Sequence, residues 1–198
     1  MKRVLLIVVV IAIGAYAAYK LFAKKDDSRA DAKPEALSIG TKSGDFRESL
    51  DNLMAAYFSL KDALVKSDTM SANNAAVRLA QASDSLKTDE IGGDSTGVIR
   101  ETAKNFAETI QGSAHALSLE KELEAKRLEF EMISDALWSL ARTVKYEGQK
   151  VYYQFCPMAF NNRGAYWISQ DPQIRNPYFG EKMLTCGSNR DSISYTSN

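Results

Sequence analysis

Apolar residues recur every three or four positions through most of the chain, the spacing that places side chains on one face of an α-helix. Four segments show this period, at residues 45–64, 72–86, 99–117 and 119–144. Only Ser118 separates the last two, but one helix over both would be very long for a small domain, so we predict two antiparallel helices joined at 117–120. Four helices with short connections predict a mainly α fold, an up-down four-helix bundle.

Polar residues before two of these segments offer helix caps. Asp45 is expected to cap the first helix, and the break at Ser67-Asp68-Thr69 supplies a cap for the second. Such side chains accept hydrogen bonds from the free N–H groups of the first helical turn.

The C-terminal part of the chain is different in kind, because eight of the 19 aromatic residues lie within residues 152–179. Each buried ring contributes about 2–3 kcal/mol, so we expect this segment to pack against the bundle. Its glycines and prolines predict loops and short elements. Tyr152–Phe155 and Tyr166–Ser169 are predicted as the strands of a short hairpin, with residues 161–164 at its turn.

The N-terminus carries an apolar run. Val4–Tyr19 has 16 residues without a charge, and the run reaches Ala23 when Lys20 snorkels to the interface. We favour an uncleaved membrane anchor over residues 1–25, with a cleaved leader as the alternative because Ala15-Tyr16-Ala17 has the form of a cleavage site. Both interpretations place the following domain in the periplasm, tethered to the inner membrane in the first case. Positive charges flank both ends of the run, so the opposite orientation stays open.

The remaining chain divides into three parts by composition. Residues 26–44 are polar and without apolar period, and we expect a flexible tether. Residues 45–190 are expected to form one domain, followed by a tail at 191–198. Five of the 25 basic residues and none of the 25 acidic residues lie in the first 25 positions, so the rest of the chain has a net charge of about −5. This charge argues against a nucleic-acid partner, since phosphate contacts need clustered Lys and Arg.

Both cysteines of the chain fall in the aromatic segment, each near a methionine: Cys156 with Met158, and Cys186 with Met183. In an extended C-x-M the two sulfurs lie on the same side of the chain, and in a helical M-x-x-C turn they share one face. Thiolates and thioethers are soft donors that select Cu(I) over Zn²⁺, Mg²⁺ or Ca²⁺. The four residues are therefore the predicted ligands of a Cu(I) site.

A disulfide between Cys156 and Cys186 is the competing interpretation, because export permits it. It would close a loop of about 30 residues and contribute roughly 3–4 kcal/mol on the chain-entropy model. Met158 and Met183 would then fill gaps in the core. The two interpretations are compatible as redox alternatives of one site.

The run VYYQFCPMAFNNRGAYWISQDPQIRNPYFGEKMLTCGS, residues 151–188, resembles a bacterial family of exported domains of unknown function. The motifs C-P-M-A-F, G-A-Y-W, N-P-Y-F-G and M-L-x-C-G carry the likeness, and LDNLMAAYFSLKDALVKSD at 50–68 resembles the start of the same domain. This family also occurs as the C-terminal domain of periplasmic adaptor subunits in copper and silver efflux pumps. The resemblance implies a heavy-metal efflux system or a copper-handling protein as partner. The chain departs from the family at Lys126-Arg127, where the family often has Gln-Arg.

Two other classes of function are an adaptor without metal and an enzyme. An adaptor without metal would dock an envelope or efflux partner through the aromatic segment and keep the disulfide. An enzyme is not expected, because the chain has no C-x-x-C, no glycine-rich phosphate loop and a single histidine, His115.

Overall fold

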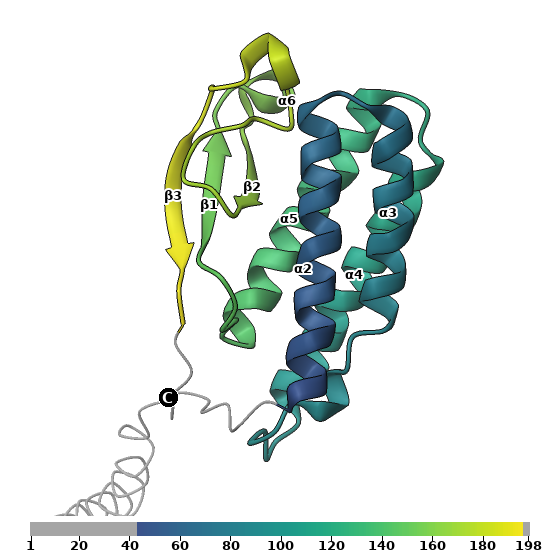
Figure 1. Cartoon of the computed structure of the whole chain (residues 1–198), viewed down its shortest axis with the longest axis vertical. Coiled ribbons are helices and arrows are strands. Elements are labelled where there is room, and N and C mark those ends of the chain that lie inside the picture. The colour runs from purple at the N-terminus through teal and green to yellow at the C-terminus, as the bar shows by residue number, and fades with distance from the viewer. Residues whose placement is uncertain (1–42, 196–198) are drawn as a thin grey trace, which may run out of the picture. The chain divides into compact units, whose positions relative to one another are not determined.

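The computed structural model describes residues 43–195, in which four long helices stand side by side and a small sheet covers one flank (Figure 1). The helices are α2 (Gly44–Val65), α3 (Thr69–Asp84), α4 (Val98–Leu119) and α5 (Leu123–Thr143). Consecutive helices pack against each other, and the connections are short apart from the stretch before α4, which contains the 3-10 turn η1 (Thr88–Glu90). The predicted mainly α bundle is confirmed.

Small residues on α3 and α4 explain the close packing of these two helices. Ala72, Ala75 and Ala76 on α3 are buried, as are Ala103 and Ala107 on α4. Alanine faces let helix backbones approach each other closely. On the other side, α2 and α5 are bridged by larger side chains, because the Tyr57 ring stacks on the Phe130 ring at 5.3 Å between centroids.

Of the two predicted helix caps, one is confirmed and one is wrong. Asp68 Oδ1 accepts a hydrogen bond from the Ser71 N–H at 3.0 Å and caps α3, as predicted. The prediction that Asp45 caps α2 is wrong, because Ser43 Oγ accepts the Phe46 N–H at 3.1 Å and Asp45 lies in the first turn. A carboxylate in the first turn still interacts favourably with the helix dipole.

A buried lysine marks the turn between α4 and α5. Lys126 is fully buried, and its Nζ donates to the Leu117 carbonyl at 3.0 Å, to the Glu120 carbonyl and to Asn73 Oδ1 on α3. Burial lowers the pKa of Lys126. The lysine donates to carbonyl groups at the end of α4, of which the Leu117 carbonyl also accepts the Glu120 N–H at 3.3 Å. Because α4 ends at Leu119 and α5 begins at Leu123, the predicted division into two helices is confirmed, with the break at residues 120–122.

The aromatic segment forms a three-stranded antiparallel sheet in the order β2-β1-β3, with β1 (Val151–Cys156) at its centre. The predicted hairpin is confirmed: β2 (Ala165–Ser169) pairs with β1, and Tyr152 lies opposite Ser169. The connection between them includes the short turn α6 (Ala159–Asn162). β3 (Ser188–Ile193) was not predicted, because its sequence Ser-Asn-Arg-Asp-Ser-Ile is polar. It runs to Ile193, into the segment 191–198 that was predicted to be a tail.

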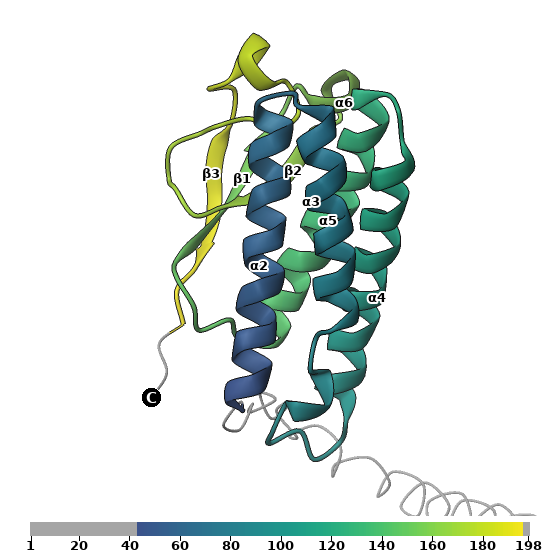
Figure 2. The same cartoon turned by 45° about the vertical axis from the view of Figure 1, so that its right-hand side comes forward.

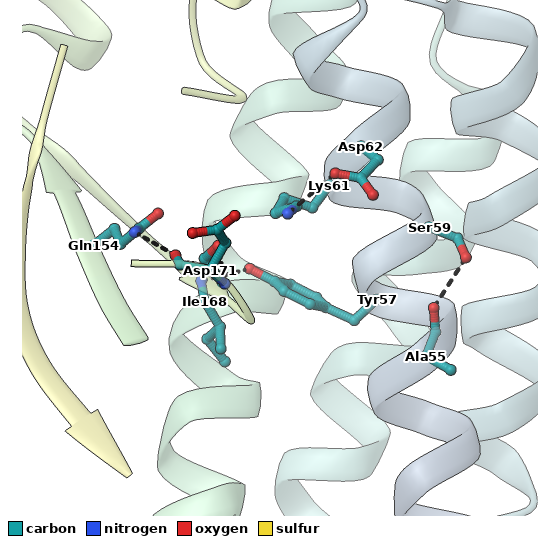
Figure 3. A network of polar contacts seen from close by, with 9 residues as sticks. Ala55, Tyr57, Ser59, Lys61, Asp62, Gln154, Ile168 and Asp171 are labelled. Carbon is teal, nitrogen blue, oxygen red and sulfur yellow. Dashed lines mark hydrogen bonds and ion pairs between the residues drawn. The ribbon is translucent and has the colours of Figure 1, made fainter. Parts of the chain in front are cut away.

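The sheet lies beside α2 and α5, on the flank of the bundle away from α3 and α4 (Figures 1 and 2). The Tyr153 ring of β1 stacks on the Trp138 ring of α5 at 4.3 Å. The buried Tyr57 hydroxyl accepts the Ile168 N–H of β2 at 2.9 Å (Figure 3). The same hydroxyl lies 2.8 Å from Ser134 Oγ on α5. These contacts confirm that the aromatic segment packs on the bundle.

Arg127, next to the buried lysine, joins the loop after β2 to the helices. Its guanidinium is buried; Nε donates to the Pro177 carbonyl at 3.0 Å and Nη1 pairs with Glu124 at 2.7 Å. Nη2 lies 3.3 Å from Ser67 Oγ in the turn between α2 and α3. The Lys126-Arg127 pair is therefore part of the structural core.

The predicted anchor at 1–25 lies outside the described residues, as does the predicted tether except for its last two positions. Among residues 43–195, no helix combines the length and apolar character needed to cross a membrane.

Candidate metal centre

The two cysteines meet beside the small sheet. Cys156 ends β1, Cys186 lies two residues before β3, and their Sγ atoms are 3.4 Å apart. Both thiols are free. The strand pairing brings them together, because Phe155 lies opposite Ser188 in the β1–β3 ladder and the neighbouring positions follow in antiparallel order.

The two thiols differ in their access to solvent. Cys156 is fully buried, whereas Cys186 is partly exposed. Burial, together with the neighbouring Cys156 thiol, raises the pKa of the Cys186 thiol. At neutral pH the Cys186 thiol therefore keeps its proton until a metal or another reaction partner displaces it.

Asn176 holds the backbone around Cys186. Its side chain is fully buried, and its Nδ2 donates to the Cys186 carbonyl at 2.8 Å. Its Oδ1 accepts the Tyr178 N–H at 2.8 Å, and its own N–H donates to the Leu184 carbonyl at 2.8 Å. The side chain and the backbone N–H of Asn176 together thus hold the turn that carries Cys186.

Gly187 allows the chain to turn tightly between Cys186 and β3. Its φ is +150°, and a Cβ at this position would lie 2.9 Å from the Phe155 carbonyl and from the Trp167 ring. Trp167 is fully buried and therefore lies directly against the backbone next to Cys186. Its strand partner is Gln154, two residues before Cys156, so Trp167 lies on the strand that pairs with the one carrying Cys156.

Gln154 ties the sheet to the loop that follows β2. Its Nε2 donates to the Asp171 carbonyl at 3.0 Å (Figure 3) and to Asn189 Oδ1 at 2.9 Å. Its buried Oε1 has no hydrogen-bond partner within the described part of the chain, and neither has Trp167 Nε1. An amide oxygen is a hard donor, so soft-metal chemistry at this place depends on the sulfur atoms.

The two methionines were predicted to share the site with the cysteines. Met158 lies in a turn with φ −92° and ψ −9°, so the extended C-x-M geometry used in its prediction is wrong. Its side chain is 45% exposed. Met183 is half-buried, and its carbonyl accepts the Cys186 N–H at 3.1 Å, which confirms the predicted turn at M-x-x-C. The structure joins the two thiols, and the role of Met158 and Met183 as ligands stays a prediction.

The distance of 3.4 Å between the two Sγ atoms lies between the length of a disulfide bond and the separation of two thiolates on one metal ion. With metal–sulfur bonds of about 2.3 Å, two thiolates of a trigonal or tetrahedral site lie about 3.8–4.0 Å apart. A disulfide bond is about 2.05 Å long. The observed 3.4 Å therefore requires about 0.5 Å of separation for a metal, or about 1.4 Å of approach for a disulfide.

Harder metal sites find no support in the rest of the domain. Among residues 43–195, no group of three or more His, Cys, Asp or Glu side chains could hold a metal ion. His115 is exposed on α4. Cys156 and Cys186 supply the thiol donors of the described residues.

The fold and the thiol pair define a helical-bundle domain with a small C-terminal sheet that carries two adjacent free cysteines. Residues 53–148 match the model of a family described as a protein of unknown function, DUF3347. The chain is similar to this family over these residues. The match covers most of α2 and all of α3, α4 and α5, and it ends before β1, so both cysteines lie beyond it. No curated protein and no solved structure matches the chain.

Proposed function

We propose that this protein binds a soft metal ion, Cu(I), outside the cytoplasm through Cys156 and Cys186. The observation that carries the proposal is the 3.4 Å separation of two free thiols that lie 30 residues apart in the sequence. Two neighbouring thiols in a partly buried place can both coordinate one thiophilic metal ion.

The donor set favours Cu(I) over Zn²⁺. A structural Zn²⁺ site takes four ligands from Cys, His and carboxylates, whereas this pair has no third group of that kind within residues 43–195. Thioethers are soft donors, and Met158 and Met183 are the sulfur side chains close in sequence to the thiols. Met158 would need to turn inward to bind, which its exposed position at a turn permits.

The cellular setting is proposed from the sequence. The N-terminal apolar run anchors the chain to the inner membrane and leaves the domain in the periplasm. The resemblance to domains of copper and silver efflux adaptors makes a heavy-metal efflux system, or another copper-handling protein, the expected partner. In that setting the protein sequesters Cu(I) or passes it on.

A competitive titration tests the proposal. The reduced full chain in detergent is titrated with Cu(I) against a chromogenic chelator, and we expect one ion bound per chain. Replacing both cysteines by serine should abolish binding. Met158→Leu and Met183→Leu should each weaken it by about 10-fold or more, at least the effect of losing an outer partner of a ligand.

Met132→Leu is the matched control, because Met132 is exposed on α5 and belongs to no proposed site. It should leave Cu(I) affinity unchanged. A variant lacking Cys156, Met158, Met183 and Cys186 that binds Cu(I) as tightly as the natural chain would overturn the proposal.

A second candidate is a metal-free adaptor in which Cys156 and Cys186 form a structural disulfide. The same 3.4 Å separation favours it, since an approach of about 1.4 Å completes the bond. Mass spectrometry of protein isolated from the cell envelope under thiol-blocking conditions discriminates between the two. A pair that is oxidised in every molecule favours the adaptor, and a pair that is reduced or metal-loaded favours the metal site.

A further inference from the structure

The two thiols differ in their access to solvent. Cys186 is partly exposed, whereas the Cys156 sulfur is fully buried behind it. A reagent from solution therefore meets the Cys186 sulfur first. The Cys156 sulfur already lies 3.4 Å from the atom that such a reagent would modify.

We propose that the pair is a thiol–disulfide exchange site, in which Cys186 attacks an incoming low-molecular-weight disulfide and Cys156 resolves the product. The inference concerns the chemistry of the thiols themselves and goes beyond metal binding. Only its consequence for metal rests on the proposed function: once oxidised, the pair has no thiolate left to bind a soft ion.

The chemistry balances in two steps. The small fraction of Cys186 that is ionised at neutral pH attacks one sulfur of R–S–S–R as the thiolate, a Cys186–S–S–R bond forms, and R–S⁻ leaves. The Cys156 thiolate then attacks the Cys186 sulfur, the Cys156–Cys186 bond forms, and a second R–S⁻ leaves. The protons of the two cysteine thiols pass to the two R–S⁻ groups, and the two electrons of the cysteine pair reduce the incoming disulfide.

The backbone favours resolution by Cys156 over release of the mixed disulfide. The Cys186 carbonyl is held by Asn176 Nδ2 at 2.8 Å, and the Cys186 N–H donates to the Met183 carbonyl at 3.1 Å. Gly187, the residue that follows Cys186, packs closely against the Phe155 carbonyl and the Trp167 ring. Because both sides of Cys186 are fixed, its sulfur stays beside Cys156 while the reagent is attached. High effective concentration of this kind is what makes an internal second step fast.

Mass spectrometry of the full chain in detergent, after exposure to oxidised glutathione, tests the assignment of roles. The natural chain should lose both free thiols and carry no glutathione, because Cys156 expels it. Cys156→Ser and Cys156→Ala should each keep one glutathione on Cys186. In Cys186→Ser, modification of the buried Cys156 should be about tenfold slower or more, since reactivity follows exposure of the thiol.

Two results would overturn the proposal: equal rates of modification in Cys156→Ala and Cys186→Ser, or a natural chain that ends with two attached glutathiones. Circular dichroism on each variant verifies that the bundle is folded, and the serine and alanine variants at position 156 guard against a substitution that disturbs the core. The Cu(I) titration of the reduced chain is separate. Failure to bind Cu(I) would remove the proposed function and leave the exchange chemistry standing, and failure of exchange would leave the metal site standing.

Discussion

Asn176→Ala is the substitution that most directly tests how the fold positions Cys186. The change removes the donor to the Cys186 carbonyl and the acceptor of the Tyr178 N–H, both at 2.8 Å. The backbone bond from Asn176 N–H to the Leu184 carbonyl survives, because alanine keeps its N–H. The perturbation is therefore confined to two hydrogen bonds and a small volume of side chain.

The magnitude follows from which groups lose their partners. A buried polar group left without a hydrogen bond costs about 1–3 kcal/mol. The Tyr178 N–H is buried and should cost the full amount, whereas the Cys186 carbonyl is partly accessible and water can replace part of its bond. The sum is a loss of about 2–4 kcal/mol in the free energy of unfolding, a large share of the roughly 5–15 kcal/mol of an ordinary domain.

Urea unfolding of the full chain in detergent, followed by tryptophan fluorescence, measures this loss. Asn176→Asp is the matched variant: one carboxylate oxygen still accepts the Tyr178 N–H, but the other faces the Cys186 carbonyl without a proton to donate. Because a buried carboxylate without a positive partner is costly, this variant should be at least as destabilised as Asn176→Ala. The alkylation rate of Cys186 should rise in both variants, because the turn that carries it is no longer held. An unfolding free energy of Asn176→Ala within about 0.5 kcal/mol of the natural chain would refute the reasoning, since surface substitutions already vary that much.

Three further predictions concern the bundle and its contact with the sheet. Tyr57→Phe leaves the buried Ile168 N–H without its acceptor and should lower the unfolding free energy by about 1–3 kcal/mol, with exposed Tyr195→Phe as the neutral control. Lys126→Met removes the amine that donates to the Leu117 and Glu120 carbonyls and to Asn73, and should cost about 1–3 kcal/mol in urea unfolding, whereas exposed Lys121→Met should be neutral. Burial is the main cause that raises the pKa of four tyrosines, at positions 57, 146, 153 and 178, above the ordinary value of about 10. The folded chain therefore keeps phenolic protons that the unfolded chain releases, so stability is fully present below pH 10 and is lost as pH rises above it. Unfolding free energies that do not fall between about pH 10.5 and 11.5 would contradict this assignment.

The polar contacts explain why part of the candidate site could be predicted and part could not. Cys156 and Cys186 were singled out from the sequence because they are the two soft thiols of the chain, each beside a methionine. That they touch depends on β3, whose polar residues carry no apolar alternation and pair with β1 through backbone hydrogen bonds. Asn176 lies ten residues before Cys186, and only the folded loop aims its amide at the Cys186 carbonyl. For Met158, chain spacing suggested an extended strand, but β1 ends at Cys156 and the next residues turn.

The sequence by itself determined the four helices and the first hairpin, because the period of apolar residues reports local geometry and burial at once. Lys126 shows the limit of that information. Its charge marks it as a surface residue in any pattern, yet the end of α4 and Asn73 of α3 surround its amine with oxygen atoms. The third strand, the buried lysine and the thiol contact all depend on groups far apart in the chain. Hydrogen bonds between such groups leave no period in the sequence, so only the tertiary structure decided them.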